Sequence, residues 1–176
     1  AEYNPLANKL IKKWSGLGNN VQFFIENINA NNTIFLKDVI PEEYNYFTRS
    51  FEYLEWRYTN HPIFKYKQFI VYSEVLHQGN GVYVCLREEL SVDNLKIIHV
   101  MDCIGDMSEI PAALSFIHDY CVNNQVHVAD FYCSTVKISR YFANVGWFSL
   151  NDDVFFNFPH LFQPVELRNP ATTSLI

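Results

Sequence analysis

The stretch IIHVMDCIGDMSEIPAALSFIHDY, residues 97–120, decides the fold because its hydrophobic pattern changes halfway along. Alternating apolar residues predict a strand over residues 95–104. A helix then begins behind Pro111, with one apolar face made by Ala113, Phe116, Ile117 and Tyr120. A strand that turns straight into a helix is a place where many enzymes hold a phosphate or an acyl group. The turn is therefore a candidate site as well as a connection between two packed elements.

Upstream of this stretch, the pattern predicts a strand, a helix and a hairpin. TIFLKDVI, residues 33–40, alternates like a strand, and Pro41 begins a helical run that extends to residue 60. Two β-rich runs, residues 67–76 and 80–90, are joined by HQGN, whose Gly and Asn are typical of a hairpin turn. We therefore expect antiparallel pairing between these two runs.

Downstream, VHVADFYC, residues 126–133, predicts a further strand. The helical run TVKISRYFANVGW ends at Gly146, a natural left-handed stop, and residues 147–162 predict a last hairpin with NDD as its turn. A hairpin series next to a β-α-β crossover requires a mixed sheet. The predicted fold class is α/β (α+β), with a mixed, mostly antiparallel sheet flanked by helices.

Composition limits the class of protein. The chain has 176 residues, of which 49% are hydrophobic and 18% charged, so we expect one packed domain rather than a disordered tail. We divide it into a lead-in or end of a preceding domain (1–32), the main domain (33–163) and a C-terminal tail (164–176). The net charge of −6, with KLIKK as the one basic cluster, argues against a nucleic-acid partner. The chain has neither a signal peptide nor a membrane span, so we expect a cytoplasmic protein.

Cysteine and aromatic residues each allow a structural and a functional interpretation. The four cysteines are far apart and lack metal-ligand spacing with His, so we expect no metal. Cys103, at the strand-to-helix turn, is the only one that we consider as a nucleophile, with plain packing as the alternative. The 15 Phe, 11 Tyr and 3 Trp predict a thick aromatic core, or rings that line a groove for a sugar or a nucleobase.

The order of these elements, together with the closing helix RYFANVGWFSL, resembles the GNAT superfamily of acyl-CoA N-acyltransferases over residues 33–163. The family's Tyr-x-x-x-Gly-Phe motif has its counterpart in Phe142-Ala143-Asn144-Val145-Gly146-Trp147. A second segment, LEWRYTNHPIFKY, is similar to a segment of GNAT-like proteins found among genes for bacterial surface sugars. The resemblance implies a splayed pair of central strands and the transfer of an acyl group from acyl-CoA to an amine.

The resemblance also implies where each ligand binds. The pantetheine arm would pair with backbone groups between residues 95–104 and 126–133 like an added strand, and the pyrophosphate would lie on the N–H groups that open the following helix. The implied coenzyme-binding residues are Met101, Cys103, Gly105, Asp106 and Ser108. A base takes the amine proton, and a strand N–H stabilises the oxyanion. The acceptor would be an amino sugar carried on a nucleotide, for surface-polysaccharide synthesis.

The chain departs from the family pattern at two places. The family's loop is rich in glycine, whereas this turn has one Gly and two acids, Asp106 and Glu109, which repel a diphosphate. The family's general-acid Tyr is replaced by Phe142, and Tyr141, one residue earlier and about 100° around the helix, is the third candidate catalytic residue beside His99 and Asp102. These departures favour an alternative, a GNAT-like binding or dimerisation domain that lacks catalysis and pairs with a second copy or a tandem domain.

Several side chains are candidates for the chemistry itself. His99 and Asp102 are candidate bases, and the two-residue period of a strand predicts that only one of them can face the site. Their alternative roles are solvent-facing or hydrogen-bonded strand residues, and Asp106 and Ser108 also fit as helix caps. Trp56, Arg57 and His61 are candidate contacts for an anionic substrate, although Arg57 could pair with a nearby Glu and His61 could simply end a helix.

Two further classes fit the sequence less well. A Fem-like aminoacyl transferase half-domain would take its acyl group from tRNA, and the acidic net charge and lack of a basic stripe count against it. A carbohydrate-binding module would explain the aromatic residues but not the two helices after the central strand.

Overall fold

The computed structural model describes residues 21–37, 49–73, 81–91, 94–133 and 136–147. The described elements, in chain order, are β1 (Phe24–Asn27), the 3₁₀ turn η1 (Ile34–Lys37), α2 (Phe51–Leu54), the π-helical turn η2 (Glu55–Thr59), β2 (Tyr66–Tyr72), β3 (Val82–Leu90), β4 (Lys96–Gly105), α3 (Ile110–Asn123), β5 (Val128–Phe131) and α4 (Val136–Asn144). The predicted hairpin turn at residues 77–80 and the predicted final hairpin lie outside the described residues.

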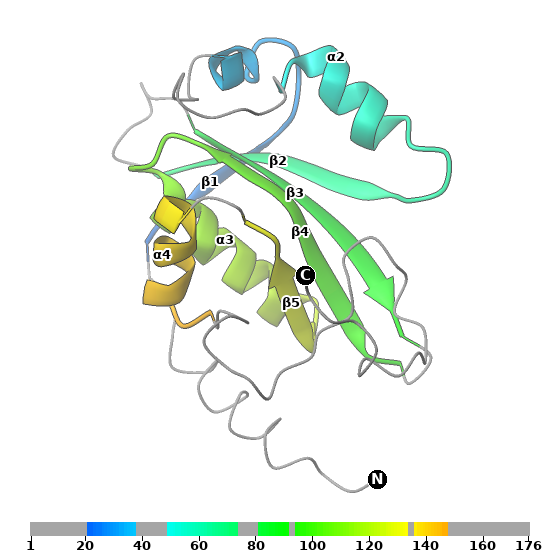
Figure 1. Ribbon diagram of the computed structural model, residues 1–176, viewed down its shortest axis with the longest axis vertical. Helices are drawn as coiled ribbons and strands as arrows, with labels where there is room; N and C mark the ends of the chain where they lie inside the picture. Colours follow the sequence, from blue (N-terminus) through cyan, green and yellow to red (C-terminus); the bar gives the residue numbers. More distant parts are fainter. Residues whose placement is uncertain (1–20, 38–48, 74–80, 92–93, 134–135, 148–176) are drawn as a thin grey trace, which may run out of the picture.

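One five-stranded sheet, in the order β1-β2-β3-β4-β5, organises these elements. The first three pairings are antiparallel, and β4 and β5 are parallel because α3 carries the chain back across the sheet between them. Figure 1 shows α2 on one face of the sheet and α3 and α4 on the other. The predicted fold class, a mixed and mostly antiparallel sheet flanked by helices, is therefore confirmed.

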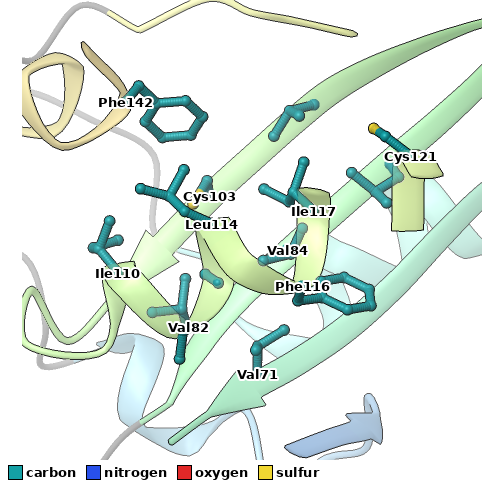
Figure 2. Packing of buried hydrophobic residues seen from close by; sticks show 14 of the residues in the cluster. Val71, Val82, Val84, Cys103, Ile110, Leu114, Phe116, Ile117, Cys121 and Phe142 are labelled. Atoms are coloured by element: carbon teal, nitrogen blue, oxygen red, sulfur yellow. The ribbon is translucent and has the colours of Figure 1, made fainter. Parts of the chain in front are cut away.

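The α3 side of the sheet carries the larger apolar cluster. From the strands it takes Val71, Val82, Val84, Leu86, Ile98, Val100 and Cys103. From α3 it takes Ile110, Leu114, Phe116 and Ile117 among others, and Phe142 of α4 closes it by stacking on Phe131 at 4.6 Å between ring centroids. Figure 2 shows the α3 side chains directed at the strand residues. Burial of this many large side chains fixes α3 and α4 against the sheet.

A smaller apolar cluster covers the α2 side. It contains Leu36 of η1, Leu54 and Tyr58 of the α2–η2 segment, and Ile70, Tyr83 and Cys85 of the sheet. Because β3 lies between both clusters, its first six residues are all buried. Polar side chains that point toward α2 are therefore held in a packed environment rather than on an open sheet face.

Two predicted elements are wrong in part. Residues 34–37, which we expected in a strand, form a 3₁₀ turn because the Asn-rich stretch before them already folds the chain: Thr33 donates its hydroxyl to the Asn29 carbonyl at 2.8 Å, and Leu36 N donates to Thr33 O at 3.1 Å. The helix that we expected from Pro41 to residue 60 is not continuous. Ser50 is extended (φ −67°, ψ 159°) and caps a new helix by accepting a hydrogen bond from Tyr53 N at 3.2 Å.

None of the helices in the described part of the chain combines the length and the apolar character that crossing a membrane requires.

Candidate functional site

The parallel pair β4–β5 opens partway along its length. Pairing runs from Ile97 with Val128 to Val100 with Phe131, after which β5 ends while β4 continues to Gly105. Figure 1 shows β4 extending beyond β5 toward the start of α3. Among the described residues, no strand pairs with Met101–Gly105 on the side that faces β5. We call this place, where β5 leaves β4 after Val100, the fork.

A β-bulge lies at the same place on the other edge of β4. Val100 pairs with Leu86 and Asp102 with Cys85, so Met101 is the extra residue of β4. The bulge shifts the alternation of side chains: Val100 and Cys103 both join the α3-side cluster, and Met101 and Ile104 lie against the α2-side cluster. A strand that bends at a bulge diverges from its neighbour more readily, which accounts for the fork.

The bulge also overturns one expectation. His99 and Asp102 were predicted to face opposite sides of the sheet, but they share the α2 face, since His99 contacts Glu89 and Asp130 while Asp102 contacts Arg49 and Tyr58. The prediction of opposite faces assumed a regular two-residue period through Met101, and the extra residue breaks that period. Both candidate bases therefore lie on one face, three residues apart.

His99 is buried between two carboxylates. Its Nδ1 lies 2.9 Å from both carboxylate oxygens of Asp130 on β5, and its Nε2 lies 3.2 Å from Oε2 of Glu89 on β3. The imidazole side chain is 4% exposed, whereas those of Asp130 and Glu89 are 14% and 17% exposed. His99 is thus neither a solvent-facing nor a strand-end residue, and both ring nitrogens face acceptors that reach solvent.

Arg87 completes this group on β3. Its Nη2 lies 3.3 Å from Glu89 Oε2, and its guanidinium lies 4.7 Å from the centre of the Phe64 ring. The Arg87 side chain is 7% exposed, and its Nε is buried without a hydrogen-bond partner. Arg87 therefore holds Glu89 in place through one nitrogen while stacking on an aromatic ring.

Asp102 has a different set of contacts, which tie α2 to the sheet. Arg49 donates from Nε to Oδ2 at 3.0 Å, and the Tyr58 hydroxyl donates to the same oxygen at 3.2 Å. Burial, followed by the nearby Asp102 carboxylate, raises the pKa of Tyr58, so its hydroxyl stays protonated and remains a donor. Asp102 is occupied as an anchor for the segment Arg49–Tyr58, and His99 is the better placed of the two candidate bases.

The turn between β4 and α3 uses most of its own N–H groups internally. Asp106 Oδ1 accepts from Ser108 N at 2.9 Å and from Ser108 Oγ at 2.7 Å, while Asp106 O accepts from Glu109 N at 3.0 Å. Ala112 N and Ala113 N donate to Glu109 O, and Pro111 has no N–H. Asp106 therefore closes the turn rather than the helix, and the prediction that Asp106 and Ser108 cap the helix is wrong, because α3 begins behind Glu109, whose side chain makes no cap hydrogen bond.

Glu109 places a carboxylate at the start of α3. The residue is 1% exposed, and its Oε2 and Oε1 accept hydrogen bonds from Ser73 N at 2.6 Å and Ser73 Oγ at 3.2 Å. The positive end of the α3 dipole is thus already close to a buried anion of the chain itself. The turn therefore has fewer unpaired N–H groups to bind a pyrophosphate than a glycine-rich loop would have.

Cys103 and Gly105 have packing roles in the described structure. Cys103 is 3% exposed in the α3-side cluster, and burial raises the pKa of its thiol, in agreement with plain packing, the alternative to a role as nucleophile. A Cβ on Gly105 would lie 2.2 Å from Gly81 O and 2.6 Å from the Val82 Cα. The close approach of β3 therefore explains the absence of a side chain at Gly105 without any ligand.

Tyr141 lies on α4, against the α3-side cluster and thus across the sheet from His99 and Asp102. Its neighbour Phe142 is buried and packs edge-on against Trp147 at 4.9 Å. The predicted stop at Gly146 is confirmed by its φ of 90°. The structure therefore does not bring the third candidate catalytic residue together with the other two.

Trp56 and Arg57 belong to η2, where Asn60 N donates to Glu55 O at 2.8 Å in a widened helical turn. Trp56 is 68% exposed, and the Arg57 guanidinium lies 5.8 Å from the Tyr58 ring centre. His61 accepts hydrogen bonds at Nδ1 from Ile63 N and Phe64 N. His61 therefore stabilises the turn that ends the helix, which is its structural alternative, while Trp56 remains available for contact.

Sequence reasoning missed Glu89 and Arg87 and gave Asp130 no assigned role. All three depend on the register of β3, β4 and β5, which pairs Arg87 and Asp130 directly with His99. One signal was present for the bulge: continued alternation from Ile98 and Val100 would have placed the charged Asp102 in the apolar α3-side cluster. Within the described residues, no group of three or more His, Cys, Asp and Glu side chains is arranged to hold a metal ion.

Comparison with known proteins gives a similarity in fold alone. No family model and no curated protein matches the chain. The fold is similar to that in the crystal structure of glucosamine-6-phosphate N-acetyltransferase from Arabidopsis thaliana, with 12% sequence identity, coverage of 81% of this chain and 99% of that chain, and a TM-score of 0.48. A likeness at this level assigns neither an activity nor a residue to this chain.

Proposed function

We propose that the chain is an N-acyltransferase that moves an acetyl or longer acyl group from acyl-CoA to an amine. The observation that carries the proposal is the fork: β4 continues for five residues beyond the last pair with β5, and the bulge at Met101 coincides with the divergence. An extended pantetheine arm carries amide groups that can pair with such an exposed strand edge. The order of elements that resembles the GNAT superfamily supports the same assignment.

The acceptor that we propose is an amino sugar carried on a nucleotide, in surface-polysaccharide synthesis. This class rests on the likeness of LEWRYTNHPIFKY to a segment of GNAT-like proteins found among such genes. The exposed Trp56 fits stacking on a sugar or a base, and Arg57 beside it fits an anionic group. We place the protein in the cytoplasm, where acyl-CoA and nucleotide sugars occur together.

A second candidate is a binding or dimerisation domain that no longer transfers an acyl group. Its support is the turn before α3, where Asp106 and Glu109 supply negative charge and Ser108 N and Glu109 N are already used within the turn. The two candidates differ in whether the isolated chain binds the coenzyme.

Isothermal titration of the full chain with acetyl-CoA at low salt tests the proposal. We expect micromolar binding, and we expect Asp106→Asn to tighten it by roughly 5-fold, about 1 kcal/mol, because it removes a charge that repels the diphosphate. Asparagine keeps the Oδ1 acceptor for Ser108 N. Asp119→Asn, which removes the same charge from an exposed residue further along α3, is the matched control and should change the affinity little.

Each result decides between the two candidates. Binding followed by acetyl transfer to an amino-sugar nucleotide supports the enzyme. Absence of binding up to millimolar acetyl-CoA, for the chain and for Asp106→Asn alike, removes the enzyme assignment and leaves the binding domain.

A further inference from the structure

The two hydrogen bonds of the Glu89–His99–Asp130 group together need more protons than a neutral imidazole supplies. Its two contacts, His99 Nδ1 with Asp130 and His99 Nε2 with Glu89, each join a ring nitrogen to a carboxylate oxygen. A hydrogen bond between a nitrogen and a carboxylate needs one proton between them. Both hydrogen bonds therefore form only if the three groups share two protons, whichever group formally owns each.

The position of this group relates it to the fork. His99 pairs with Asp130 one residue before the last β4–β5 pair, Val100 with Phe131. Asp130 is therefore next to the place where the two strands part, whereas Glu89 pairs with Ile97 further from it. The chain of three side chains leads from the fork, through a buried imidazole, to a second partly exposed carboxylate.

From these observations we propose that Asp130, His99 and Glu89 form a proton-transfer chain that removes the amine proton during acyl transfer. The assignment rests on the proposed function. It names Asp130 as the group nearest the amine, His99 as the buried link and Glu89 as the exit, with Arg87 as a positioning residue that holds Glu89.

The proton balance of the reaction requires that one proton reach solvent. An ammonium group loses two protons as its nitrogen forms the C–N bond of the amide; one proton goes to the thiolate released when the C–S bond breaks, and one goes to solvent. A proton taken up by the Asp130 carboxylate passes to His99 Nδ1, the proton on Nε2 passes to Glu89, and Glu89 releases one proton to water, so that one proton enters the group and one leaves it. No oxidant, metal or further reactant takes part.

Other charged groups near His99 set the background for any pH dependence. Arg87 and Glu89 face it from β3 and Asp130 from β5, while Asp102 lies three residues along β4, paired with Arg49 and Tyr58. A pH profile alone would therefore combine several groups, so the test needs a signal that belongs to His99.

Long-range ¹⁵N NMR of the His ring nitrogens in the full chain gives that signal without coenzyme. His99→Gln identifies the resonances by their loss. We expect both His99 nitrogens to have shifts between those of a bare and a fully protonated ring nitrogen or at the protonated limit, with Asp130→Asn changing mainly Nδ1 and Glu89→Gln changing mainly Nε2. Asp119→Asn should change neither. The proposal of shared protons is overturned if one His99 ring nitrogen has the chemical shift of a bare nitrogen and none of these variants changes the His99 shifts.

Kinetic measurements then test whether these three side chains take part in acyl transfer. Asp130→Asn should lower kcat by about 10²-fold or more, with the acetyl-CoA affinity within about twofold of wild type, and Asp130→Glu should restore part of the rate. Thermal unfolding checks that each variant is folded. Normal coenzyme binding with unchanged kcat in Asp130→Asn overturns the proton-transfer role alone. Failure of the wild-type chain to bind acetyl-CoA overturns the proposed function and the role together, and the NMR result then shows whether the shared-proton group exists without them.

Discussion

Gly105 ends β4 where the backbone of β3 leaves no room for a side chain. The family resemblance implied that Gly105 is one of the coenzyme-binding residues, but a Cβ there would lie within 2.6 Å of two backbone atoms of Gly81 and Val82. Backbone atoms cannot rotate away as a side chain can, so the strands themselves would have to separate. The single glycine of the turn is therefore explained at the scale of one residue by strand packing.

We expect Gly105→Ala to lower the free energy of unfolding by about 3 kcal/mol or more, because it forces β3 and β4 apart. Gly146→Ala, at a φ of 90°, is the comparison and should cost roughly 1–2 kcal/mol through backbone strain alone. Urea unfolding of the two variants measures the difference. If Gly105→Ala kept full stability but lost acetyl-CoA binding, the residue would instead serve the ligand.

At the scale of elements, the short segment formed by α2 and η2 depends on one carboxylate for its place on the sheet. The segment has nine residues, of which Leu54 and Tyr58 are buried, so helix propensity alone cannot hold it. Asp102 receives hydrogen bonds from Arg49, just before α2, and from Tyr58 within η2. Both ends of the segment are thus tied to the same residue of β4.

Asp102→Ala should destabilise the fold by roughly 2–4 kcal/mol, because it leaves the half-buried Arg49 guanidinium and the Tyr58 hydroxyl without their acceptor. Tyr58→Phe, which removes one hydrogen bond and keeps the ring, should cost about 1 kcal/mol. Hydrogen exchange should show the loss of protection first at the Leu54 and Asn60 amides, whose hydrogen bonds close the turns of α2 and η2. Unchanged exchange at these amides in Asp102→Ala would contradict the anchoring role.

The elements that could be predicted are those that place apolar side chains at regular intervals in the α3-side cluster. The order β2, β3, β4, α3, β5 and α4 follows from alternation and from the apolar face of α3, and all six are present. The misses have local causes: Thr33 and Asn29 form a turn by a side-chain hydrogen bond, and Ser50 starts a new helix. The sequence pattern alone does not show whether such a side-chain hydrogen bond forms or whether the strand or helix continues.

The site was less predictable than the fold because it depends on register. His99 and Asp102 could be named from the sequence, but their shared face depends on the bulge at Met101, and the contacts of His99 depend on which residues of β3 and β5 lie beside it. Register is set by the whole sheet and by turns between strands. Neither Glu89 nor Asp130 has a distinguishing neighbour along the chain itself.

At the scale of the whole molecule, the two apolar clusters enclose three of the four cysteines. Cys103 and Cys121 lie in the α3-side cluster and Cys85 in the α2-side cluster, while Cys133 follows β5 and is partly exposed. Burial raises the pKa of Cys85 and Cys103, and it raises the pKa of Cys121 to about 12. Since the thiolate is the reactive form, each of these three thiols is protected both by lack of access and by protonation.

Labelling of the native protein with a thiol reagent such as Ellman's reagent at pH 8 should therefore modify Cys133 within minutes and the other three only through opening of the sheet. Because Cys85 and Cys103 lie on opposite faces of the same sheet, their slow rates should agree with each other and with the global free energy of unfolding from urea titration. Cys133→Ser should abolish the fast phase and leave the slow one. A rapid reaction at Cys103 in the native state would show that the turn before α3 opens independently of the core, and would restore that thiol as a candidate for chemistry at the fork.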